Sequence, residues 1–129
     1  MPGQKKILIT RKLPDAVINR AQASYQATLN NNDEPYGVDQ MIELAQEKDA
    51  VLCTLTNDMS RSVIERLPNS ICAIATFSVG YEHIDLEAAK ERGIIVTNTP
   101  GVLTEATADV ALLLILGASR RSREGAAMI

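Results

Sequence analysis

The sequence contains few of the residue types on which many binding and catalytic sites depend. Its 129 residues include no Trp, one Phe, three Tyr and one His, and its formal net charge is -3. Nucleic-acid surfaces are basic and often stack bases on aromatic rings, so this composition argues against one. Two Cys and one His at these spacings are also too few to hold a zinc ion. We therefore predict neither a nucleic-acid partner nor a metal site.

Glycine pairs of the kind that bind phosphate are missing. The seven glycines lie at positions 3, 37, 80, 93, 101, 117 and 125, and no two are separated by a single residue. A G-x-G-x-x-G turn requires such a pair, and no Walker loop is present either. The 129 residues therefore contain no glycine-rich cradle for the phosphates of a nucleotide.

What is present is typical of one ordinary soluble domain. Hydrophobic residues make up 46% and charged residues 22% of the sequence, which is enough to bury a core. Cys53 and Cys72 lie inside apolar runs, and the sequence shows no secretory signal. We expect two reduced core thiols in a cytoplasmic protein.

Apolar patterns of two periods alternate along the chain. Short apolar runs predict strands at 7–10, 25–29, 50–55, 71–77 and 94–97. The third and fourth are apolar enough to be buried on both faces. Helical patterns follow the strands, beginning at Pro14, Val38, Ser60, Leu86 and Thr104. Five strand-then-helix units predict an α/β fold, a flavodoxin-like doubly wound parallel sheet with the order 2-1-3-4-5.

The last predicted helix has no polar face. Thr104 is its expected N-cap, Gly125 its expected end, and residues 110–118 form an apolar run of nine residues. A membrane span needs roughly 18 to 20 apolar residues, so we predict no membrane insertion. A helix that is apolar on every side must be covered by other protein surface.

Function in such a sheet is expected at the carboxyl ends of the strands. The loops there are predicted at 10–12, 55–58, 78–81 and 98–101. Gly80 can adopt backbone angles closed to other residues, so the amides of Val79 and Gly80 could bind a small anion. A tight turn without a ligand is the alternative explanation for this glycine.

The only histidine offers little support for catalysis. His83 precedes a predicted helix, beside Glu82 and Asp85, where it is expected to be a surface turn residue. No Ser-His-Asp set, Cys-His pair or carboxylate dyad is evident. Asp85 is the predicted N-cap of that helix, and Gly93 is predicted to end it.

Two segments carry a family resemblance. FSVGYEHIDLEAAKERGIIVTNTPGVLTEATADVALLLILGASRR at 77–121 and DAVLCTLTNDMSRSVIERLPN at 49–69 resemble the N-terminal domain of the D-isomer-specific 2-hydroxyacid dehydrogenases, with the glyoxylate and hydroxypyruvate reductases nearest. The resemblance implies a substrate-binding (catalytic) domain at 1–100. It also implies an interdomain helix at 101–129 that leads to a separate NAD(P)-binding Rossmann domain and takes part in a homodimer contact, through the helix 104–121.

The resemblance also implies roles for particular residues. The backbone amides of Ser78, Val79 and Gly80 are expected to hold the carboxylate of a 2-oxo acid, and Leu55 to pack on the substrate side chain, with Thr56 and Asn57 beside it. Thr107 is expected near the nicotinamide end of the cofactor.

The catalytic Arg, Glu and His of the family are expected beyond Ile129, so we assign no catalytic residue within the sequence. Neither Arg120 nor His83 is a candidate for those roles.

The implied activity is hydride transfer between NAD or NADP and a small 2-oxo acid, giving a D-2-hydroxy acid. The 129 residues alone are expected to be inactive and to self-associate. Two alternatives remain open at this point: a non-enzymatic binding or corepressor protein on the same scaffold, and a receiver-like domain of the same sheet order. A receiver needs acidic residues after the first and third strands, where this sequence has Thr-Arg-Lys at 10–12 and Leu-Thr-Asn at 55–57.

Overall fold

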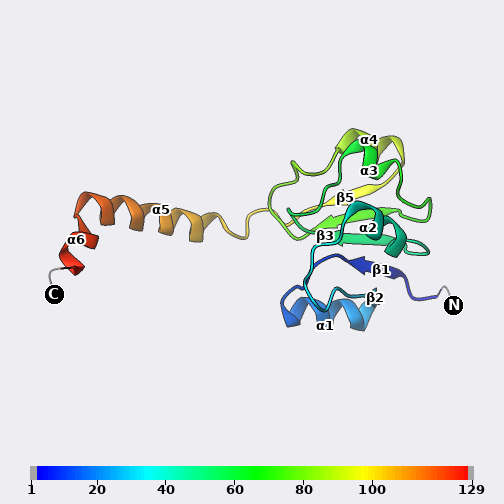
Figure 1. Cartoon of the computed structure of the whole chain (residues 1–129), viewed down its shortest axis with the longest axis horizontal. Coiled ribbons are helices and arrows are strands. Elements are labelled where there is room, and N and C mark those ends of the chain that lie inside the picture. Colours follow the sequence, from blue (N-terminus) through cyan, green and yellow to red (C-terminus); the bar gives the residue numbers. More distant parts are fainter. Residues whose placement is uncertain (1–2, 128–129) are drawn as a thin grey trace. The chain divides into compact units, whose positions relative to one another are not determined.

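A computed structural model of the protein describes residues 3–127, which form two compact units divided between Thr99 and Pro100. The first unit contains a parallel sheet with the order β2-β1-β3-β4-β5 (Figure 1), which confirms the predicted fold. Its strands are β1 (Lys6–Ile9), β2 (Gln26–Thr28), β3 (Ala50–Cys53), β4 (Ala73–Thr76) and β5 (Ile95–Thr97). Its helices are α1 (Asp15–Ser24), α2 (Val38–Leu44), α3 (Arg61–Ile64) and α4 (Leu86–Glu91).

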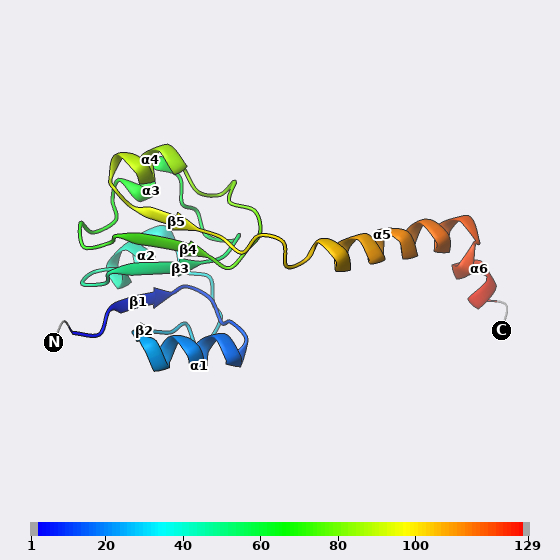
Figure 2. The same cartoon turned by 180° about the vertical axis from the view of Figure 1, so that it is seen from behind.

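One face of the sheet carries the main core. Leu8, Val51 and Ile74 are paired across β1, β3 and β4, and all three are fully buried. Side chains from α2, α3 and α4 pack on this row, among them Met41 and Ile64. Figure 2 shows these three helices on one side of the sheet and α1 on the other, next to β1 and β2.

The opposite face is covered less completely. Ile7, Ile9 and Ala21 form a smaller cluster between β1 and α1. Over β3 and β4, side chains such as Leu52 and Ala75 are only half-buried, and they line an apolar hollow of about 430 Å³. The prediction that the third and fourth strands are buried on both faces is therefore wrong for this face, because the cluster around α1 is centred on β1.

The two cysteines differ in their environment. Cys53 is fully buried on β3, and burial raises the pKa of its thiol to about 11. Cys72 is exposed, because it precedes β4 and borders the apolar hollow, so the prediction of two core thiols is wrong for Cys72. Its Sγ donates a hydrogen bond to the carbonyl oxygen of Asp49 at 3.3 Å.

The predicted helix ends are confirmed at α4. The Asp85 side chain accepts a hydrogen bond from the amide of Ala88 at 2.8 Å, as an N-cap does. Gly93 has a φ of 67°, the left-handed conformation that commonly ends a helix. Ser60 precedes α3 as predicted, but its side chain makes no capping hydrogen bond.

The second unit consists of α5 (Thr104–Ser119) and α6 (Ser122–Ala126). Leu103, not Thr104, occupies the N-cap position of α5. The helix does not continue to Gly125, because Arg121 adopts a left-handed φ of 51° and redirects the chain into α6.

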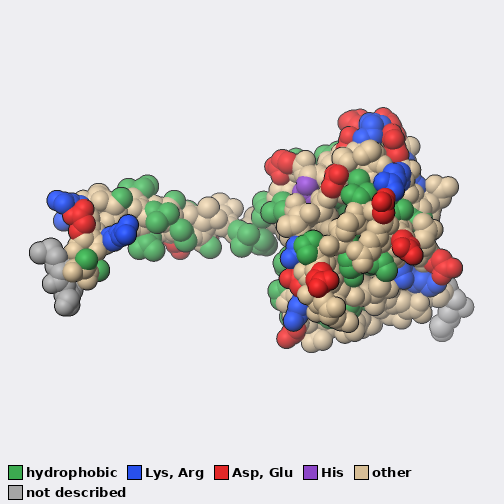
Figure 3. Space-filling model, in the orientation of Figure 1, with side chains coloured by type: hydrophobic (Ala, Val, Ile, Leu, Met, Phe, Trp, Pro, Cys, Tyr) green, Lys and Arg blue, Asp and Glu red, His purple; other side chains and the backbone are tan. Residues whose placement is uncertain are grey.

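The apolar side chains of α5 are exposed (Figure 3), with Val110 at 54% and Leu113 at 67%. None of the described residues of this helix is buried. Within 3–127, no helix is both long enough and apolar enough to cross a membrane.

Candidate functional site

Hydrogen bonds join the first two loops at the carboxyl edge of the sheet. Thr10, after β1, donates its hydroxyl to Oδ1 of Asn57 at 2.7 Å, and the amide of Thr54 donates to the same oxygen at 3.0 Å. Arg11 donates to the Thr56 hydroxyl at 2.8 Å. Asn57 is only 5% exposed, so it ties the two loops together and does not face a ligand.

The other two loops are joined in the same way. The amide of Thr99 donates to the carbonyl of Ser78 at 2.9 Å, and the side-chain amide of Asn98 donates to the carbonyl of Val79 at 2.7 Å. Within the loop itself, the Ser78 hydroxyl donates to the carbonyl of Gly80 at 2.6 Å. All three carbonyls of the segment 78–80 are therefore occupied by donors of the protein.

The backbone amides of the segment 78–80, in contrast, have no partner in the described structure. Among residues 3–127, no atom accepts a hydrogen bond from the backbone N–H of Ser78, Val79 or Gly80. In a trans peptide the N–H points away from the preceding carbonyl, so anchoring the carbonyls of Ser78 and Val79 fixes the N–H directions of Val79 and Gly80. Fixed, unpaired amides in successive residues can together donate hydrogen bonds to one small anion.

The backbone conformation of Gly80 differs from the one that the sequence analysis considered. Its φ lies outside the positive region, so the expectation of a backbone conformation closed to other residues is wrong. A Cβ at this position would instead overlap the carboxylate of Glu82. The space that a side chain would fill at Gly80 is occupied by that carboxylate.

Leu55 lies in the loop after β3, next to the strand that leads into 78–80, and is 61% exposed. An exposed apolar side chain at this edge can contact the non-polar part of a small ligand. The structure thus places Leu55, Ser78, Val79 and Gly80 on two neighbouring loops of one unit. Thr107 lies in the other unit, exposed, near the start of α5.

His83 is part of the site's support, which the sequence analysis missed. His83 lies in a turn, as predicted, but the prediction of a surface position is wrong, because the side chain is half-buried and its Nε2 lies 3.1 Å from Oγ1 of Thr76. The Thr76 hydroxyl in turn lies 2.6 Å from the hydroxyl of Ser78. Thr76 and Ser78 are two residues apart at a strand end, a spacing that puts side chains on the same face and could have indicated the link.

The environment of His83 favours an uncharged ring. Burial lowers the pKa of His83 below its ordinary value, and the nearby Glu82 carboxylate opposes that shift only in part. Nδ1 is buried and has no hydrogen-bond partner within the described residues.

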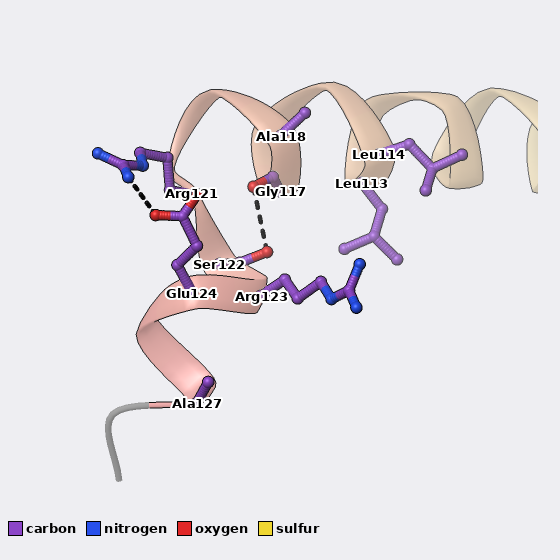
Figure 4. Close-up of a pocket in the computed structure, with 9 residues that line it drawn as sticks. All are labelled: Leu113, Leu114, Gly117, Ala118, Arg121, Ser122, Arg123, Glu124 and Ala127. Carbon is purple, nitrogen blue, oxygen red and sulfur yellow. Dashed lines mark hydrogen bonds and ion pairs between the residues drawn. The ribbon is translucent and has the colours of Figure 1, made fainter.

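A separate hollow of about 690 Å³ lies at the corner between α5 and α6 (Figure 4). Leu113 and Leu114 line it, and the Ser122 hydroxyl donates to the carbonyl of Gly117 at 3.1 Å across the corner. Arg121, which could attract an anion, is already paired with Glu124. We place the candidate site at 78–80 because the unpaired amides are there.

The described residues fit neither a metal ion nor the phosphates of a dinucleotide. No group of three or more His, Cys, Asp or Glu side chains in 3–127 could hold a metal. The sequence also has no glycine-rich phosphate turn.

Comparison with known proteins identifies relatives of this arrangement. The model of the D-isomer specific 2-hydroxyacid dehydrogenase catalytic domain matches residues 7–129. Glycerate dehydrogenase from Hyphomicrobium methylovorum is 48% identical over 127 residues, which cover 98% of this chain and 39% of that protein. Glyoxylate reductase from Thermococcus litoralis is 40% identical over 126 residues, covering 96% and 37%.

The fold is shared as well. The crystal structure of a D-isomer specific 2-hydroxyacid dehydrogenase, NAD-binding, from Polaromonas sp. JS6 66 matches with a TM-score of 0.81 at 31% identity, covering 95% of this chain and 41% of that one. The chain spans about two fifths of the length of the relatives it matches. The family resemblance of its motifs is confirmed: the chain belongs to the D-isomer specific 2-hydroxyacid dehydrogenase family and corresponds to its catalytic domain.

Proposed function

We propose that this chain is the substrate-binding part of an NAD(P)-dependent oxidoreductase that interconverts a small 2-oxo acid and a D-2-hydroxy acid. The observation that carries the proposal is the segment 78–80, whose carbonyls are all anchored while its amides are unpaired. The relatives also support the proposed function: the family model matches, and a glycerate dehydrogenase and a glyoxylate reductase are 48% and 40% identical to the chain.

The amides of Ser78, Val79 and Gly80 would bind the substrate carboxylate. A hydrogen bond from a backbone amide to a carboxylate contributes about 1.5 to 3 kcal/mol, so two or three of them can orient a small acid. Leu55 would contact the remainder of the substrate. The glycerate dehydrogenase and the glyoxylate reductase among its relatives favour acids as small as glyoxylate or hydroxypyruvate.

Hydride transfer and proton transfer need groups other than the acid-binding segment. Thr107 would contact the nicotinamide end of NAD or NADP, which supplies or accepts the hydride when it is bound. The acid–base and carboxylate-orienting groups of the family, a His paired with a Glu and an Arg, would come from protein beyond Ile129. The chain's own contribution is to bind the acid and hold it in one orientation.

We further propose a homodimer through the helix that runs from Thr104 to Arg121. Its apolar side chains are exposed throughout the described unit, among them Leu113, Leu114 and Ile115. A contiguous apolar surface of this kind is typical of a protein–protein contact.

A chimeric enzyme tests the proposed reaction. The chain would replace the 127 matching residues of glycerate dehydrogenase from Hyphomicrobium methylovorum. We expect the chimera to oxidise NADH or NADPH with glyoxylate or hydroxypyruvate, and the 129-residue chain alone to show no turnover. A folded chimera that binds the cofactor but reduces neither acid would contradict the proposal and favour a non-enzymatic binding protein.

A further inference from the structure

We propose that His83 is a positioning residue for the carboxylate-binding segment. Its ring N–H begins a directed chain of hydrogen bonds that passes through the hydroxyls of Thr76 and Ser78 to the carbonyl of Gly80. The inference rests on the proposed function in so far as the ligand of the segment is a carboxylic acid. The chain itself is a property of the ligand-free protein.

The direction of the chain follows from the number of protons available. The Gly80 carbonyl can only accept, so the single hydroxyl proton of Ser78 is used in that bond of 2.6 Å. The contact of 2.6 Å between Ser78 and Thr76 must then use the proton of Thr76. Thr76 has no second proton, so in the contact of 3.1 Å it accepts from Nε2–H of His83.

The same reasoning fixes the state of the ring. Nε2 must carry a proton, while Nδ1 is buried without a partner among the described residues. A proton on Nδ1 would be a buried donor with nothing to accept it, and it would place a positive charge on a half-buried ring. His83 is therefore neutral, as the Nε2–H tautomer.

This series of hydrogen bonds anchors the carbonyl of Gly80, the one carbonyl of the segment 78–80 that the neighbouring loop does not hold. Thr99 and Asn98 fix the carbonyls of Ser78 and Val79. The carbonyl of Gly80 is held only from within, by the Ser78 hydroxyl and through it by Thr76 and His83. That bond also orients the peptide that leads out of the loop, including the amide of Tyr81, which has no acceptor in 3–127.

The backbone of His83 is itself held in place. The residue lies in the turn before α4, and its backbone carbonyl accepts a hydrogen bond from the amide of Met59 at 3.1 Å. Thr76, the middle link of the hydrogen-bond series, is the last residue of β4 and is 2% exposed. Its hydroxyl therefore cannot exchange its partners freely for water. Its buried neighbour on β3, the Cys53 thiol, adds no charge because its pKa is raised.

The first test needs no ligand. His83 is the only histidine, so the ring nitrogen signals of the 15N-labelled 129-residue chain belong to it alone. We expect the chemical shifts of a neutral ring with the proton on Nε2 near neutral pH. A proton on Nδ1, whether in the other neutral tautomer or in a charged ring, would overturn the proposal. This measurement remains decisive if the variants below fold poorly.

The second test compares variants at both ends of the first bond. His83→Phe keeps a ring and removes the donor, His83→Gln can still place an N–H near Thr76, and Thr76→Val removes the next link at similar volume. We expect His83→Phe and Thr76→Val each to increase the backbone motion of Gly80 and Tyr81, measured as lower 15N order parameters, because the Gly80 carbonyl loses its anchor. Losing one such bond should also weaken glyoxylate binding by roughly threefold to tenfold.

The pattern among the variants shows whether His83 acts through its hydrogen bond to Thr76 or only by filling space. His83→Gln should restore most of the loss, and the double variant His83→Phe with Thr76→Val should lose no more than either single one, because both break the same chain. Unchanged order parameters and binding in His83→Phe would overturn the proposal while leaving the proposed function intact. If the wild-type protein binds no glyoxylate at 78–80, the proposed function fails, and the tautomer and the order parameters still decide the role of His83.

Discussion

Nε2 of His83 lies 3.1 Å from Oγ1 of Thr76, so the turn before α4 is joined by a side chain to the end of β4. Between these two residues the chain forms the segment 78–80, whose carbonyls are all anchored. The contact thus joins a residue before the segment to a residue after it by a side-chain hydrogen bond. Because Nδ1 of the same ring is buried and unpaired in the described structure, a proton gained by His83 has no acceptor.

Stability should therefore depend on the protonation of His83. Burial lowers its pKa in the folded chain, with Glu82 as the charged neighbour that opposes the shift. Below the ordinary value of about 6.5, the unfolded chain binds a proton that the folded chain does not, so the free energy of unfolding decreases as pH falls. Above that value the contribution is fully present.

The measurement is urea unfolding at about pH 7.5 and about pH 5.5, on either side of the ordinary histidine value. We expect wild type to lose stability between the two, and His83→Gln to lose clearly less, since it has no group titrating there. Equal losses in both proteins would show that other groups cause the pH dependence.

Replacing Gly80 should impair binding of the acid specifically. A valine side chain would displace the Glu82 carboxylate and add bulk beside the amide of residue 80. In the chimeric enzyme we expect Gly80→Val to raise KM for glyoxylate tenfold or more, which corresponds to the loss of about one amide–carboxylate bond. The KM for NADH or NADPH should change little.

A matched glycine is available as the control for this variant. Gly37 has no atom within 4 Å of an added Cβ and a φ of -66° that other residues adopt. Gly37→Val should leave KM for glyoxylate unchanged. An unchanged KM in Gly80→Val as well would remove the carboxylate assignment from 78–80.

The N-cap of α4 should contribute measurably to stability. Asp85 accepts from the amide of Ala88 at 2.8 Å, and removing such a cap costs about 1 kcal/mol. We expect Asp85→Ala to lower the free energy of unfolding by that amount, and Asp85→Asn, which keeps an acceptor, to lose much less. Similar losses in both variants would instead point to the charge of Asp85 near Arg61 at 3.7 Å.

The exposed surface of α5 should cause the chain to self-associate. We expect light scattering to show species larger than a monomer at high concentration, and Leu113→Glu to shift them toward the monomer. Leu55→Glu is the control, because Leu55 is a leucine of similar exposure in the first unit. A monomeric wild-type chain under the same conditions would contradict a contact through this helix.

The strands and helices could be predicted because each depends on a pattern that is local in the sequence, and repeated strand–helix units adopt few sheet orders. Short apolar runs alternate with helical spacing, and turn residues such as Asp85 and Gly93 have fixed backbone roles. The coverage of each sheet face could not be predicted in this way. Leu52 is half-buried because of where α1 lies, which its own neighbours in the sequence do not reveal.

The main-chain part of the candidate site could be proposed from the sequence, whereas the side chains that hold the loops in place could not. Val79 and Gly80 could be proposed from their place after a strand and from the family resemblance. His83 was misjudged because its sequence neighbours are charged and its contact is with Thr76, seven residues earlier. Asn57 was expected beside the substrate, whereas its side chain is used by Thr10 and Thr54.

The most direct test of the central claim follows the backbone amides of the chain during a titration with glyoxylate. If the segment binds the carboxylate, the 15N–1H signals of Val79 and Gly80 should shift most and should saturate, and Gly80→Val should abolish the effect. Shifts that are absent, or that are spread over the surface without saturation, would contradict the account.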